Sequence, residues 1–141
     1  MSRTRFGLSM FTALALIAPP LAIAETVTFH AMMNGAQEVP ANTTAGKGEA
    51  TVKLDTVAKT ITYNVTYSGL TGPAGAAHIH GPAAPGANAG VLFPFAAPAS
   101  PIAGTAPITD AQIADLTAGK YYVNVHTAAN KGGEIRGQLT K

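Results

Sequence analysis

Three of the four histidines in the chain are spaced in a way that could hold a metal ion. His78 and His80 are two residues apart, so in an extended segment both imidazoles point to the same face. His126 alternates with Val123 and Val125, which places it on the polar side of a later strand. All three imidazoles are therefore expected on polar faces rather than buried ones. Imidazole suits copper and zinc, and three histidines leave one position open, so the sequence predicts a copper site, or else a zinc site, if the strands meet.

Two charged residues that follow His126 are candidates for supporting such a site. If residues 127–133 form a loop symmetric about Asn130, Glu134 lies directly opposite His126, and such cross-strand neighbours have Cβ atoms roughly 5 Å apart. Metal-ligating histidines usually donate their second ring N–H to a carboxylate or a carbonyl. Glu134 could accept that bond, with Arg136 beside it on the same face. The alternative is a solvated pair of charges on an exposed strand.

Other residue patterns give little support to catalysis, and no catalytic residue is assigned. Ser68 and Ser100 have no neighbouring base, and the seven acidic residues are scattered along the chain. His30 and Met32 share a face of an expected first strand and could form a softer, Cu(I)-like pair with Met33 nearby. An ordinary strand near the start of the mature domain is the simpler interpretation.

The start of the chain has the layout of a secretory signal. Arg3 and Arg5 precede an apolar stretch, and small residues up to Ala24 suit a signal peptidase. Polar residues and two prolines interrupt the stretch, which argues against a membrane-spanning helix. The sequence thus predicts removal of residues 1–24 and a domain at residues 25–141 that is periplasmic or secreted.

Composition narrows the function of this expected domain. Two of the nine Lys and Arg residues lie in the expected signal, so the remainder carries seven basic and seven acidic residues and no net charge. Without a basic cluster it lacks the electrostatic footprint of nucleic-acid binding. The chain has no cysteine, which excludes disulfides and thiolate metal sites.

Alternation of polar and apolar residues predicts short antiparallel strands. A first strand is expected at residues 26–33. One hairpin is indicated by residues 49–54 and 60–67, and a second by residues 121–126 and 134–139. A Thr-x-x-Gln capping box predicts a short surface helix at residues 109–117. Six prolines in residues 82–107 predict a long loop with one short strand around residues 91–95. The expected fold is an all-β antiparallel β-sandwich with one short helix.

Several motifs of the chain resemble those of the CHRD (chordin-domain) family. They are Glu38-Val39-Pro40, Ser68-Gly69-Leu70, Ala77 to Pro82, and the segment from Tyr122 to Leu139 with its Gly132-Gly133 pair. The resemblance runs from about Thr26 to Leu139. It implies an extracytoplasmic β-sandwich, and it implies no established catalytic reaction.

A weaker resemblance links the chain to copper,zinc superoxide dismutases and their Ig-like sandwich. It implies that His78, His80 and His126 are copper ligands and that Arg136 guides superoxide. The chain departs from that family because it lacks the bridging histidine, the acidic zinc loop and the cysteine pair. Three hypotheses stay open: a copper- or zinc-binding domain, a superoxide-dismutase-like copper enzyme, and a metal-free interaction module that uses a sheet edge or the Pro/Ala-rich loop.

Overall fold

The computed structural model describes residues 25–141, so the expected signal at residues 1–24 lies outside the described residues. The described chain is all-β with a single α-helix, which confirms the predicted class. Its elements are β1 (Thr26–Asn34), the 3-10 helix η1 (Gly35–Gln37), β2 (Lys47–Asp55), β3 (Thr60–Ser68), β4 (Ala74–His80), β5 (Val91–Pro94), β6 (Ile102–Pro107), α1 (Asp110–Thr117), β7 (Tyr122–Thr127) and β8 (Ile135–Gln138). Within residues 25–141, no helix is long and apolar enough to cross a membrane.

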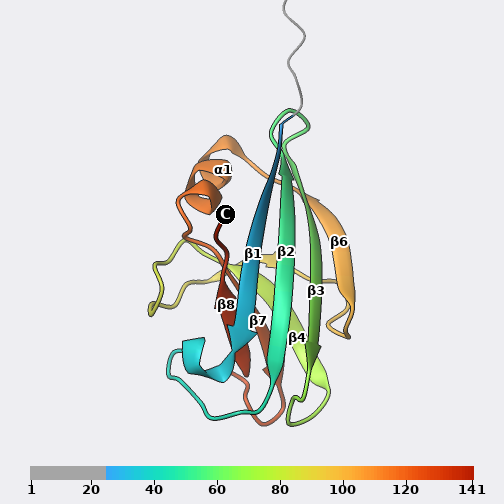
Figure 1. Ribbon diagram of the computed structural model, residues 1–141, viewed down its shortest axis with the longest axis vertical. Coiled ribbons are helices and arrows are strands. Elements are labelled where there is room, and N and C mark those ends of the chain that lie inside the picture. Colours follow the sequence, from blue (N-terminus) through green and yellow to red (C-terminus); the bar gives the residue numbers. More distant parts are fainter. Residues whose placement is uncertain (1–24) are drawn as a thin grey trace, which may run out of the picture.

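The eight strands of the described chain form one folded-over antiparallel sheet in the order β5-β4-β7-β8-β1-β2-β3-β6. The sheet has two layers, and in Figure 1 β1, β2, β3 and β6 form the near layer while β4, β7 and β8 lie behind them. The layers are joined where Asn34 of β1 pairs with Arg136 of β8, and by a bridge between His30 and Thr140. Apolar side chains from both layers fill the space between them.

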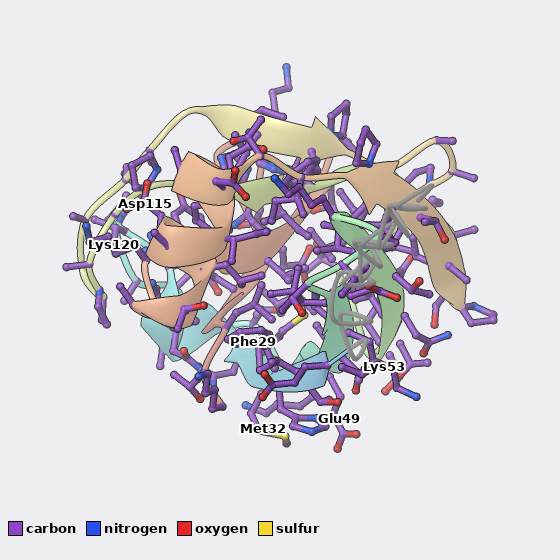
Figure 2. All side chains as sticks on the ribbon, turned by 90° about the horizontal axis from the view of Figure 1, so that it is seen from above. Phe29, Met32, Glu49, Lys53, Asp115 and Lys120 are labelled. Carbon is purple, nitrogen blue, oxygen red and sulfur yellow. The ribbon has the colours of Figure 1, made fainter. Side chains whose placement is uncertain are left out.

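The near layer follows the predicted alternation of apolar and polar residues. Phe29, Val52 and Tyr63 are register partners across β1, β2 and β3, and all three are buried in the core. On the opposite face Met32 is 66% exposed and pairs with Glu49. Figure 2 shows Phe29 pointing between the layers while Met32 and Glu49 point away from them. A sheet with one face on the core and one in solvent produces this alternation.

The predicted helix is confirmed, whereas the predicted long loop contains an additional strand. Thr109 caps α1 and forms the expected reciprocal capping box with Gln112. Strand β5 lies where a short strand was expected, but β6 (Ile102–Pro107) was not predicted. It pairs only with β3 and forms an edge of the sheet, where proline is tolerated. Its small residues suit this place, because a Cβ on Gly104 would collide with the Tyr63 ring.

Candidate metal centre

The second layer brings the three predicted histidines together. Strands β4 and β7 are direct neighbours, with His78 opposite Asn124 and Ala76 opposite His126. One ligand atom from each of His78, His80 and His126 lies within 4.8 Å of the other two. The closest pair is His78 Nδ1 and His126 Nε2, which are 3.2 Å apart and form a hydrogen bond. Three imidazoles from two distant segments therefore lie close together, which is the condition that the predicted metal site required.

Backbone carbonyls fix the orientation of two of these rings. His80 Nδ1 lies 3.0 Å from the Ala89 carbonyl oxygen, and His126 Nδ1 lies 2.9 Å from that of Lys131. A carbonyl oxygen can only accept, so Nδ1 carries a proton in both rings, and in the neutral form of either ring the lone pair is then on Nε2. His80 Nε2 is buried and has no hydrogen-bond partner among the described residues. Its lone pair is therefore available to a cation.

The expectation that all three imidazoles lie on exposed faces is wrong for His80. This ring is only 9% exposed, and His78 and His126 are half-buried. The reason is that residues 82–90 lie against the outer face of β4, β7 and β8, where they hydrogen-bond to His80, Arg136 and Gln138. The face is polar, as predicted, but it is covered around His80.

Hydrogen bonds to the backbone of residues 82–90 hold this segment in place. The Ala89 carbonyl accepts from His80 Nδ1, and the Ala89 N–H donates to the Tyr122 hydroxyl at 3.1 Å. The Arg136 guanidinium donates to the Ala87 carbonyl at 2.7 Å and to Asn88 Oδ1 at 3.1 Å. We call residues 82–90 the covering loop. Its contact with His80 makes the loop part of the site.

Behind His80 lies a stack of two further side chains. The Tyr122 ring is parallel to the His80 imidazole within 4°, with 4.9 Å between ring centroids. The Arg136 guanidinium lies 3.5 Å from the centre of the same Tyr122 ring, in cation–π contact. Arg136 thus supports His80 through Tyr122. The role implied for it by the dismutase resemblance, guiding an anion from solvent, is wrong, because Arg136 is 2% exposed and enclosed by the covering loop.

The expectation that Glu134 orients His126 is also wrong. The paired ladder between β7 and β8 ends at Val125 and Ile135, so the register that would set Glu134 against His126 is not continued. The fully buried Glu134 carboxylate instead accepts four hydrogen bonds, at 2.6 to 2.8 Å. The donors are the hydroxyls of Thr44, Thr71 and Thr127 and the backbone N–H of Thr71. Burial opposes ionisation, but these hydrogen bonds outweigh it and lower the pKa of Glu134 to about 2.

Glu38 follows η1, and its buried side chain hydrogen-bonds to the second layer. The sequence did not reveal it as a neighbour of the site. Its carboxylate accepts a 2.6 Å hydrogen bond from Asn124 Nδ2, and Asn124 is the register partner of His78. Burial raises the pKa of Glu38 to about 7, although the Arg136 charge and the Asn124 amide oppose the rise. Gly133, at φ +131°, leaves room for this carboxylate, because a Cβ there would lie 2.6 Å from Glu38 Oε1.

The surroundings favour the neutral form of His78 and His80. Burial lowers the pKa of His78, and positive charge on His126 or His80 would lower it further. Burial likewise lowers the pKa of His80, with His126 and Arg136 adding to the effect and the hydrogen bond to Ala89 opposing it. A neutral imidazole is the form that binds a metal ion, so the site is prepared for a cation.

An open hollow of about 550 Å³ adjoins two of the three histidines. Its polar lining residues are His78, His126, Thr127 and Lys131, and the rest of the lining comes from small residues of β4 and its neighbours, among them Ala76 and Ala128. His80 is not part of this lining. The cluster therefore has a covered side at His80 and an open side at the hollow.

Comparison with known proteins identifies one family. The family model described as "CHRD domain" matches residues 29–139, which is most of the chain. No curated protein and no solved structure matches the chain significantly.

Proposed function

The chain belongs to the CHRD-domain family, and from this premise we propose that it is an exported copper-binding protein, with zinc as the second choice of ion. His78, His80 and His126 would hold the ion. CHRD domains are generally found in extracellular or secreted proteins, which supports the expected export. Export to the periplasm or beyond also agrees with the secretory layout of residues 1–24.

The observation that carries this proposal is the unpartnered Nε2 atom of His80. A buried polar atom without a hydrogen bond costs about 1–3 kcal/mol, so native proteins rarely retain one without a purpose. Here the atom belongs to a ring fixed through its other nitrogen by Ala89 and accompanied by two more imidazoles. An ion bound at the cluster would satisfy it.

The shortest nitrogen–nitrogen distance and the ligand chemistry suit a divalent first-row metal. In a tetrahedral site with metal–nitrogen bonds of about 2.0–2.1 Å, ligand nitrogens lie about 3.3 Å apart. The separation of 3.2 Å between His78 Nδ1 and His126 Nε2 is close to this value. Copper is preferred over zinc because a given nitrogen site binds Cu(II) more tightly than Zn(II).

The two alternative hypotheses have less support. The hypothesis of a superoxide-dismutase-like enzyme depended in part on Arg136 as a residue that guides superoxide. It has less support because the Arg136 side chain is enclosed. A metal-free module could use a sheet edge or the Pro/Ala-rich loop. Residues 82–90 of that loop are bonded to the sheet, which leaves the edge strands β5 and β6 as its candidate surface.

Calorimetric titration of the purified protein with Cu(II), Cu(I) and Zn(II) tests the proposal. We expect one ion per chain, and we expect His78→Ala and His126→Ala each to weaken Cu(II) binding by about 100-fold or more, because each removes one of three ligands. His30→Ala is the matched control, since His30 lies exposed on the outer face of β1. Unchanged Cu(II) affinity in both site variants would refute the proposed site.

A further inference from the structure

The hollow beside the histidine cluster has the size and lining of a small-molecule site. Its volume of about 550 Å³ lies within the range of about 300–1,000 Å³ that is usual for ligand pockets. Pro73, Ala74, Ala76 and Ala128 give it an apolar wall. Such sites typically combine apolar walls with a few polar groups that fix the orientation of the ligand. Here the polar groups belong to His78, His126, Thr127 and Lys131.

The open side of a bound ion would face this hollow. His78 and His126 line the hollow, whereas His80 is buried beneath the covering loop and does not line it. An ion held by all three rings has His80 on its covered side and the hollow on the other. Three imidazoles leave one position of a four-coordinate ion free. That free position is therefore the one that a molecule in the hollow can reach.

The charges around the hollow select the kind of ligand. Lys131 lies at its exposed rim, and within the described residues no carboxylate contributes to the lining. A metal cation together with a lysine attracts an anion. The wall of alanine and proline in turn favours a ligand with an apolar body, because burial of apolar surface contributes about 25 cal/mol per Å².

We propose that the hollow binds a small organic carboxylate, whose oxygen completes the coordination of the metal and whose apolar body lies against the Ala76 and Ala128 wall. This inference rests on the proposed metal site. Lys131 contributes charge at the rim, and the small side chains of the wall leave the space that the apolar body fills. The ligand class is set jointly by the metal, the lysine and the wall.

The test compares phenylacetate with acetate, which have the same carboxylate and differ in the apolar body. Binding of each to the copper-loaded and the metal-free protein is followed by calorimetry and by the visible spectrum of Cu(II). We expect phenylacetate to bind the copper-loaded protein about tenfold more tightly than acetate, because burial of about 55 Å² of the phenyl group gives that factor. We expect the metal-free protein to bind both anions at least tenfold more weakly.

Variants of the wall and the rim assign the binding to the hollow. Ala76→Leu and Ala128→Leu fill the space and are expected to remove the tenfold preference for phenylacetate while copper affinity is retained. Lys131→Met is expected to weaken the binding of both anions about threefold. Ala103→Leu is the matched control, because Ala103 is an exposed strand residue of β6 away from the hollow. If Ala76→Leu disturbs copper binding through its register partner His126, Ala128→Leu decides the result.

The outcomes separate this inference from the proposed function. If the unaltered protein binds no copper, both are overturned. If copper binds but phenylacetate and acetate bind equally, the carboxylate site is overturned and the metal site stands. A preference for phenylacetate that persists in Ala76→Leu and Ala128→Leu places the anion elsewhere and also overturns this inference. Equal binding of phenylacetate with and without copper has the same consequence.

Discussion

The two layers of the sandwich use their outer faces in different ways. On the near layer, outward side chains such as Met32 and Glu49 extend into solvent (Figure 2). On the second layer the outer face is covered around His80. The buried polar and charged residues of the described chain all lie in the strands of this layer or hydrogen-bond to them: Glu38, His80, Asn124, Thr127, Glu134 and Arg136. The same antiparallel architecture therefore supports a plain solvent-facing sheet on one side and a desolvated polar site on the other.

This difference shows what a functional face requires of a small sandwich. An imidazole on the near layer would keep its ordinary hydration, whereas His80 loses water because the covering loop lies over it. Covering the face makes every hydrogen bond there more important, since a buried group without a partner is costly. We expect substitutions of buried polar residues in the second layer to lower the free energy of unfolding by several kcal/mol. Matched substitutions on the near layer should leave it nearly unchanged.

The largest effect is expected for Glu134→Ala. The variant removes a carboxylate that accepts four hydrogen bonds and leaves the buried Thr127 hydroxyl without its acceptor, so we expect the free energy of unfolding to fall by about 3–5 kcal/mol. Glu49→Ala, on the exposed face of β2, should change it by less than about 0.5 kcal/mol. Urea denaturation of both variants measures the difference. Equal losses in the two variants would mean that the layers do not differ in this way.

An intermediate effect is expected from the pH dependence of Glu38. Its pKa is about 7 in the folded protein and 4.5 in the reference state, so the folded state binds the extra proton between these values. The contribution of Glu38 to the free energy of unfolding is therefore fully present below pH 4.5 and is lost as the pH rises through 7. Glu38→Gln keeps the group neutral and should gain about 1–2 kcal/mol relative to the original protein on going from pH 4.5 to pH 8.

The comparison with Glu38→Gln is necessary because His78 and His80 change the stability with pH in the direction opposite to Glu38. The pKa values of His78 and His80 are lowered on folding, so their effect is to make stability rise with pH up to about the reference value of 6.5. Subtracting the two urea titration series cancels the histidines and isolates Glu38. A difference between the two proteins that does not change with pH would show that Glu38 titrates normally.

The contrast between the layers also explains what the sequence could predict. Strands β1, β2 and β3 face solvent on one side, so their alternation was readable and their positions were predicted closely. The same alternation argument placed His78 and His80 on one face of their strand and His126 on the polar side of another, and the pairing of β4 with β7 brings the three together. In contrast, β6 has mostly small residues, such as Ala103 and Gly104, whose alternation is too weak to indicate a strand.

The parts of the site that could not be predicted depend on contacts between distant segments. The covering loop is rich in alanine, glycine and proline, and it is held mainly through backbone atoms, which leave no trace in residue type. Glu38 meets Asn124 across 86 positions of the chain, and Glu134 is turned away from His126 by the end of the β7–β8 ladder. Each of these requires knowledge of the tertiary structure.

The smallest effect is expected at the histidine and methionine pair of the near layer. His30 and Met32 share the exposed face of β1, but Met33 points into the core and is 1% exposed, so it cannot join them as a third soft ligand. His30 also lies next to the Thr51 hydroxyl, at 3.3 Å from its Nδ1. Met32→Thr keeps a residue suited to a strand and should change the free energy of unfolding by less than about 0.5 kcal/mol.

The same variant tests whether the covered face alone binds copper. We expect Met32→Thr to leave both the Cu(I) affinity and the stoichiometry of one ion per chain unchanged in calorimetric titration, because an exposed two-residue pair lacks the desolvation and the fixed rings of the cluster. Loss of a second bound Cu(I) equivalent in Met32→Thr would show that the near layer also binds metal. In that case burial by the covering loop would not be what distinguishes the two faces.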